Sequence, residues 1–274
     1  MFTNNPFAGL ADFLPSAFMQ VYIALMLVAV VAGTLFDVVH KGSARYFFQN
    51  MRKSRGKARK PVGGGGLVSL AVQTAVVDVL ASGEFCNPRR RVAHLLGMYG
   101  FVLYVVATVL LVFKPETSSL VVQLWWLGAA MICVGGYWFW FFIRVDVAAE
   151  GHSPFRLVRA DLFILSLLAS ATLALLWGWA QAAGIPGARV LFWLYLLGTT
   201  VLFCGVPWSK FAHMFFKPAA ALEKRISRAD GTAENLPTLS RDDPEQQKRH
   251  SMELLRDAPM DMGLGIKREA PRHY

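Results

Sequence analysis

Long, nearly uninterrupted apolar runs are the feature that most restricts how this chain can fold. A helix needs about 20 mainly apolar residues to cross the hydrocarbon core of a bilayer. In that medium each backbone polar group must find its partner within the protein, which favours helices. The runs of this length cover residues 17–39, 92–113, 121–143, 161–183 and 189–215. They predict an all-α integral membrane protein, a bundle of five transmembrane helices.

The charge distribution supports a membrane protein and argues against a nucleic-acid-binding one. Only 17% of the 274 residues are charged and 55% are hydrophobic, whereas soluble domains carry about 25% charged residues. The net charge of +10 is concentrated between the apolar runs, where membrane topology explains it. We therefore expect no nucleic-acid partner.

Basic residues alternate between the loops and predict the orientation. The loop from His40 to Arg91 contains eleven Lys and Arg, whereas "KPETSS" in the next loop contains one. Because basic loops stay in the cytoplasm, we expect the N-terminus outside and the C-terminus inside. No Lys or Arg precedes the first apolar run, so no cleaved signal peptide is predicted.

The first loop and the C-terminal tail differ from the apolar runs. Residues 67–83 predict a short cytoplasmic or interfacial helix between the first two spans. The basic stretch 52–60 fits either anionic membrane lipid or an acidic protein partner. Residues 1–224 are expected to form one membrane domain, followed by a polar cytoplasmic tail over 225–274.

Cysteine and most histidine positions offer no cofactor site of their own. Cys86, Cys133 and Cys204 form no paired motif, so we expect three free thiols and neither an iron–sulfur cluster nor a zinc site. The histidines expected to lie in solvent or at the membrane interface are His40, His152, His250 and His273.

His94 and His213 are the two histidines that suggest a cofactor. His94 lies near the cytoplasmic start of the second predicted span, and His213 near the cytoplasmic end of the fifth. A haem iron takes two axial nitrogens from facing helices, so both side chains are candidate axial ligands. The alternative is a pair of interfacial histidines that never meet.

Neighbouring residues are compatible with a haem at this depth. Small residues near His94 leave room for a planar ligand, namely Ala93, Gly97 and Gly100. Basic residues close to the two histidines are candidates for contacts with the haem propionates, namely Arg89, Arg90, Arg91 and Lys210.

Two segments carry a resemblance to a known family. "RRRVAHLLGMYGFVLYVVATVLLVF", from Arg89, and "PWSKFAHMFFKP", from Pro207, are similar to the cytochrome b subunits of the nitrate reductase gamma and heterodisulfide reductase type. Within that family, the chain most resembles the membrane anchors of adenylylsulfate reductase. The resemblance covers residues 18–224 and implies a multi-pass protein of the bacterial inner membrane.

The family resemblance, taken with a departure from the family's pattern, leads us to expect one haem b rather than two. Family members bind one haem near each membrane face, and their cytoplasmic-side ligands fall on His94 and His213. The positions of the outer ligands hold Tyr104 and Tyr195, so we expect only the cytoplasmic-side haem. A quinone is then expected on that side, with Asp37, His40 and Lys210 as nearby polar groups.

The expected function is electron transfer between the quinone pool and a cytoplasmic enzyme that carries flavin and iron–sulfur clusters. The chain itself would catalyse nothing beyond quinone reduction or quinol oxidation. Two alternatives remain from the sequence: a haem-free membrane anchor that docks a soluble redox enzyme, and a small-molecule transporter. The transporter is disfavoured because the spans contain few polar residues and no inverted repeat.

Overall fold

A computed structural model describes residues 3–15, 17–41, 43–145, 153–211, 213–232 and 243–250, and all regular structure in these ranges is helical. The α-helices are α1 Phe18–Lys41, α2 Ser43–Arg55, α3 Gly64–Gln73, α4 Pro88–Phe113, α5 Ser119–Trp138, α6 Leu162–Ala182, α7 Ala188–Cys204, α8 His213–Ala229 and α9 Pro244–His250. A π-helical segment extends each of two helices: η2 Thr74–Leu80 follows α3, and η3 Phe139–Ile143 follows α5. The 3-10 helices in the described residues are η1 Ala8–Asp12, η4 Arg159–Asp161 and η5 Val206–Trp208.

Four helical segments are long and apolar enough to cross a membrane. They are Phe18–His40, Pro88–Phe113, Ser119–Ile143 and Arg159–Ala182, each with 23 to 26 residues. The all-helical class is therefore confirmed, and four of the five expected spans form helices that are capable of crossing a membrane. Helix α7 is apolar but has only 17 residues, so the count of five spans stays a prediction.

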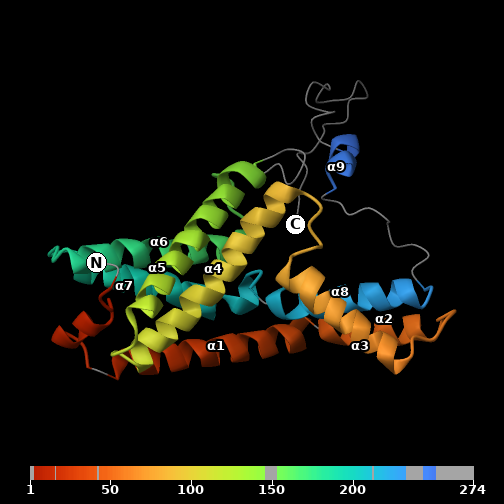
Figure 1. The fold of residues 1–274 in the computed structure, drawn as a ribbon, viewed down its shortest axis with the longest axis horizontal. Coiled ribbons are helices and arrows are strands. Elements are labelled where there is room, and N and C mark those ends of the chain that lie inside the picture. The colour runs from red at the N-terminus through yellow and green to blue at the C-terminus, as the bar shows by residue number, and fades with distance from the viewer. Residues whose placement is uncertain are drawn as a thin grey trace.

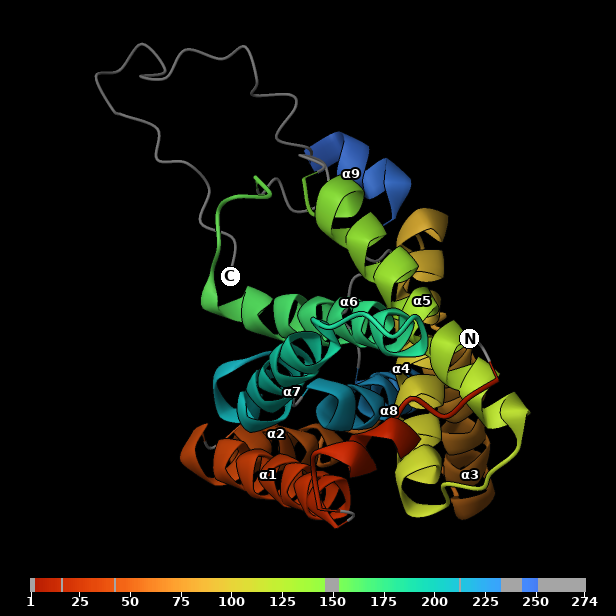
Figure 2. The same ribbon diagram turned by 90° about the vertical axis from the view of Figure 1, so that its left-hand side faces the viewer.

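The long helices pair as two hairpins set at an angle to each other (Figures 1 and 2). One hairpin is α4 with α5, the other is α6 with α7, and α1 lies along α7 and η5. Glycines bring α4 and α5 close together, because a Cβ on Gly128 would stand 2.6 Å from the backbone nitrogen of Tyr104. Small residues at helix contacts are how membrane helices pack without a hydrophobic driving force between them.

The last predicted span is not one continuous helix. We expected residues 189–215 to form a single helix, but α7 ends at Cys204 and α8 begins at His213. Pro207 has no N–H to continue the hydrogen-bond ladder and lies in η5 between the two helices. His213 therefore belongs to α8 and not to the helix that carries Tyr195, which corrects the expectation from the sequence.

The segment that precedes α1 folds back over one end of the bundle. The side-chain amide of Asn5 donates to the carbonyl of Leu111, 2.8 Å, at the end of α4. At the end of α6, Gln181 donates to the carbonyl of Pro6, 3.0 Å. These bonds place Phe7 in the core beside Trp125 and Trp177.

Helices α2, α3 with η2, and α8 lie side by side at the opposite end of the bundle (Figure 1). Arg225 of α8 donates two hydrogen bonds to Asp78 of η2, 2.5 and 2.9 Å, and these bonds raise the pKa of Arg225. The helix expected over 67–83 is thus present as 64–80 and packs on α8. Helix α8 runs to Ala229, so the expected boundary at residue 224 falls inside a helix.

Candidate functional site

His94 lies in the second turn of α4, whose start is well defined by its sequence. The side chain of Asn87 caps the helix by accepting from the backbone N–H groups of Arg89 and Arg90, 3.0 and 3.4 Å. Pro88 occupies the first helical turn, where its missing N–H costs no hydrogen bond. The cap therefore fixes where His94 stands on the helix.

The imidazole of His94 is held from two sides by the loop that precedes α4. The hydroxyl of Ser82 lies 3.0 Å from Nδ1 of His94, and the ring of Phe85 lies 4.8 Å from the imidazole, tilted by 46°. His94 is half-buried and Ser82 is buried. The hydrogen bond at Nδ1 and the ring contact with Phe85 together fix the orientation of the imidazole.

Of the three small residues near His94, only Gly97 faces open space. A Cβ on Gly97, one turn after His94, would meet no atom within 4 Å. Gly100 is instead packed against α5, since a Cβ there would stand 2.9 Å from the carbonyl oxygen of Gly128. Ala93 is buried against α5 too, where its carbonyl faces Gly135. A Cβ would thus meet open space at Gly97 and packed neighbours at Gly100, and room for a bulky ligand stays a prediction.

The first residue of α8 is His213, whose side chain lies outside the described structure. Its neighbours on both sides contact α4 or the loop that precedes α4. Phe211 packs on Phe101 of α4, with ring centroids 6.3 Å apart. One turn after His213, Lys217 donates to Glu84, 2.8 Å, and lies 5.6 Å from the ring of Phe85. The fold thus brings the start of α8 next to the His94 region.

The basic residues predicted near the haem have different roles in the structure. Arg90 lies 5.8 Å from the ring of Phe85, close to the candidate site. Arg91 donates from Nε to the carbonyl of Ala81, 2.8 Å, and so holds the loop. Lys210 is exposed in the link between η5 and α8. Lys217, which the sequence analysis missed, is the second cation at Phe85.

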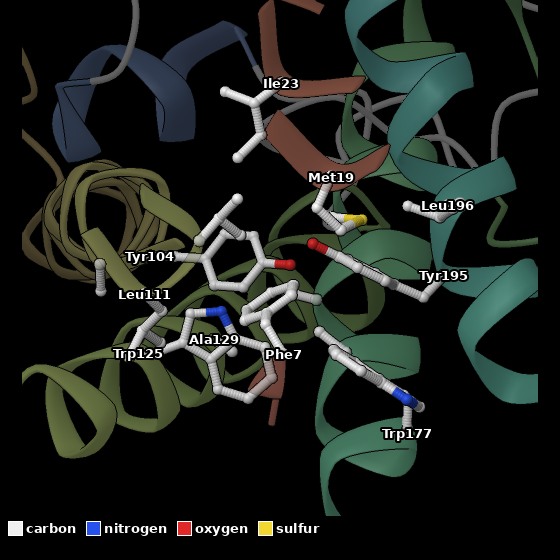
Figure 3. Packing of buried hydrophobic residues seen from close by; sticks show 14 of the residues in the cluster. Phe7, Met19, Ile23, Tyr104, Leu111, Trp125, Ala129, Trp177, Tyr195 and Leu196 are labelled. Atoms are coloured by element: carbon white, nitrogen blue, oxygen red, sulfur yellow. The ribbon is translucent and has the colours of Figure 1, made fainter. Parts of the chain in front are cut away.

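Tyr104 and Tyr195 lie in a filled aromatic core (Figure 3). Both are buried, with 5% and 2% of their surface exposed, and their hydroxyl groups point toward each other. Tyr195 stacks on Trp177 with a centroid distance of 5.5 Å, and Tyr104 lies 5.8 Å from Trp125. Tyr104 and Tyr195 are therefore packed side chains of the core.

The polar groups expected near a quinone separate into buried and exposed residues. Asp37 of α1 is buried, at 5% exposure, one turn after Gly33, whose Cβ position lies 3.0 Å from Val206 of η5. His40 is exposed and stacks on Phe36 with a centroid distance of 5.1 Å. Asp37 is therefore the only buried residue among Asp37, His40 and Lys210. It lies near the contact of α1 with η5, the segment between α7 and α8.

An ion pair that the sequence did not predict joins the residue after η3 to the end of η4. Arg144, only 1% exposed, contacts Asp161 at 2.6 Å. It also donates to the carbonyls of Ser153 and Arg156, 2.7 and 2.6 Å, and lies over the ring of Trp140 at 4.1 Å. From the sequence alone, Arg144 was recognisable only as a basic residue after an apolar run. With its donors directed at these two carbonyls, Arg144 holds the chain at Ser153 and Arg156 against the end of η3.

The remaining candidate ligands add no second site. None of the three cysteines, Cys86, Cys133 and Cys204, forms a disulfide in the described structure. In the part of the chain that the structure describes, no group of three His, Cys, Asp or Glu side chains is arranged to hold a metal ion. His152 and His273 lie outside the described residues, and His250 ends α9 without a described side chain.

Comparisons with protein-family models, with curated proteins and with solved structures find no match to this chain.

Proposed function

We propose that this protein is a membrane-bound b-type cytochrome subunit with a single haem between His94 and His213. The observation that supports it most is the arrangement around His94. Its Nδ1 is hydrogen-bonded to Ser82, open space adjoins it at Gly97, and the start of α8 contacts the same loop through Lys217. Such a site needs Nε2 of one histidine to face the partner helix.

The residues around the site would bind and orient rather than react. Ser82 and Phe85 fix the plane of the His94 imidazole, and Arg90 and Lys217 place positive charge around Phe85. These two cations would pair with the two propionate carboxylates of a haem. The haem, when bound, supplies the one-electron carrier, while the chain supplies ligation, burial and charge.

We propose five spans with the N-terminus outside and the C-terminus in the cytoplasm of a bacterial inner membrane. The direction of the chain alternates from α1 through α4, α5, α6 and α7 (Figure 1). The short turns after α4 and α6 gather at the end covered by residues 5–7. The basic loop and α8 lie at the other end, as the positive-inside rule requires of the cytoplasmic side.

The proposed reaction partners are the quinone pool and a cytoplasmic redox enzyme with flavin and iron–sulfur clusters, with adenylylsulfate reductase as the specific candidate from the family resemblance. Asp37 is the proposed proton-carrying group for quinone chemistry, because buried ionisable residues in membrane spans are commonly functional. Its burial at the contact of α1 with η5 supports a quinone headgroup on the same side as the haem.

A reduced-minus-oxidised absorption spectrum of the purified full-length protein tests this function. We expect the bands of a low-spin b-type haem, one per chain. They should disappear in His94→Ala and in His213→Ala but persist in His40→Ala, which removes an exposed histidine of α1. Absence of the bands in the wild-type protein would reject the haem. Full haem content in either ligand variant would reject the ligand pair.

A haem-free anchor is the second candidate, favoured by the exposed basic side chains after the first span. They line residues 52–60 and include Arg52, Lys53, Arg55, Lys57, Arg59 and Lys60. A spectrum without haem bands, together with partner binding that weakens with salt and with charge reversal at 52–60, would favour this anchor. Binding that is independent of salt would count against docking through this stretch.

A further inference from the structure

Ser82 stands out because its backbone conformation is one that serine rarely adopts. Its φ angle is +48°, the only positive φ of a non-glycine residue among those that the structure describes. Glycine adopts this region freely, whereas a Cβ makes it unfavourable. Ser82 is also buried, at 1% exposure, so its side chain rather than its backbone explains why serine occupies this place.

The loop around Ser82 is tied down by side chains of α4. Tyr99 donates to the carbonyl of Leu80 and Arg91 donates to the carbonyl of Ala81, each at 2.8 Å. On the other side, the N–H of Gly83 donates to the carbonyl of Val77, 2.7 Å. These bonds fix the backbone immediately before and after Ser82, so the hydroxyl is presented to one helix from a rigid loop.

The hydroxyl is directed at His94. Its oxygen lies 3.0 Å from Nδ1, and Phe85, three residues after Ser82, covers the imidazole at 4.8 Å. A ligating histidine is usually oriented by a hydrogen bond at the nitrogen opposite the metal, which also fixes which nitrogen carries the proton. Arg91, Tyr99 and His94 all belong to α4, so one helix both carries the imidazole and anchors the loop that orients it.

We propose that Ser82 is the positioning residue of the haem site, an assignment that rests on the proposed function. Its oxygen accepts a hydrogen bond from Nδ1–H of His94, so Nε2 would be the nitrogen that ligates the haem iron. The left-handed backbone at Ser82 is retained because only this conformation places the hydroxyl at Nδ1. Ser82 touches neither iron nor quinone and acts only through His94.

Two substitutions separate this role from a structural one. Ser82→Gly removes the hydroxyl and relieves the backbone, whereas Ser82→Ala removes the hydroxyl and keeps the unfavourable φ. If Ser82 only shaped the loop, Ser82→Gly would bind haem as the wild type does. If it positions His94, both variants should bind haem about 10- to 100-fold more weakly, the usual cost of losing such a partner. Both should also show altered electron paramagnetic resonance g values for the oxidised low-spin haem.

A matched control is Ser166→Ala. Ser166 is a buried serine whose hydroxyl donates to the carbonyl of Leu162 within its own helix, 2.6 Å, and it contacts no histidine in the described structure. We expect unchanged haem affinity and spectrum for this variant. Weakening of haem binding by Ser166→Ala equal to that in the Ser82 variants would overturn the specific role of Ser82.

A second measurement does not depend on haem. In haem-free full-length protein labelled with ¹⁵N-histidine, the His94 signals are assigned by their loss in His94→Gln. We expect the Nδ1–H tautomer in the wild type and a mixture of tautomers in Ser82→Ala and Ser82→Gly. An Nε2–H tautomer in the wild type, or a tautomer that neither variant changes, overturns the proposal.

The two measurements distinguish the failure of this inference from the failure of the proposed function. If the wild-type protein binds no haem, the function is rejected and the tautomer alone decides whether Ser82 orients His94. If the wild type binds haem and the Ser82→Gly variant binds it equally well with the same spectrum, the role of Ser82 is rejected and the cytochrome function stands.

Discussion

The two ends of the α4–α5 hairpin differ in what surrounds their helix contacts. At the end near Tyr104, aromatic side chains fill the bundle, and Trp125 and Trp177 have no exposed surface. At the other end, His94 is half-buried beside an open position at Gly97. Packing stabilises the first region, whereas the second is held by polar contacts from a loop. The comparison shows that one hairpin can combine a densely packed end with an end whose surroundings depend on a separate loop.

The largest expected effect on stability comes from removing a large side chain from the aromatic core around Tyr104. Trp177→Ala should destabilise the protein by about 3–5 kcal/mol, because the surrounding rings lose their contacts and a cavity remains. The control Trp208→Ala removes a side chain that is 67% exposed and should change stability little. Thermal unfolding in detergent measures both. Equal stability of the two variants would show that the aromatic cluster does not hold the bundle together.

Adding one methyl group at each of two glycines in the same hairpin tests how tightly the helices pack at each position. A Cβ on Gly128 would collide with the backbone of Tyr104 at 2.6 Å, so Gly128→Ala should cost about 1–3 kcal/mol through forced separation of α4 and α5. Gly97→Ala meets open space and should stabilise α4 by about 1 kcal/mol, from helix propensity alone. Unfolding curves of the two variants give the sign of each change.

Filling the open position tests whether the space at Gly97 matters for the cofactor. Gly97→Leu should leave the fold intact but lower haem content, because the side chain enters the space beside His94. Gly97→Ala, with one methyl group, should reduce haem content less. Haem per chain is read from the absorption spectrum. Full haem content in Gly97→Leu would mean that the haem lies on another side of His94.

The smallest expected effect concerns the contact that brings α8 to the loop. Lys217 and Glu84 form an ion pair at 2.8 Å, but the side chain of Lys217 is 53% exposed, so Lys217→Ala should cost at most about 1 kcal/mol of stability. If Lys217 also faces a propionate, haem affinity falls more than stability does. Loss of stability without any change in haem affinity would limit Lys217 to the ion pair.

The sequence located His94 but not the residues that hold it. His94 was recognisable because a histidine inside an apolar run is uncommon. Ser82 and Phe85 lie in a separate segment, and only the Ser82–Gly83 dipeptide signalled a turn there. Which side chain of a turn reaches a neighbouring helix depends on how the turn is anchored, and here Arg91 and Tyr99 anchor it.

The sequence also misjudged where the last span ends. Apolar residues continue past Cys204, and the hydropathy pattern therefore predicted a helix to residue 215. The pattern contained Pro207 but did not show whether the helix would kink or stop there. In the structure it stops, because η5 turns the chain against α1 at Gly33.

The sequence by itself determined the membrane-capable helices and the segregation of basic residues, because both depend on composition over about 20 residues. The tertiary structure decided which positions are filled and which are open. Ala93, Gly97 and Gly100 look alike in the sequence, yet only Gly97 faces open space. That distinction depends on which face of α4 meets α5, and helix packing sets that face through contacts between distant segments.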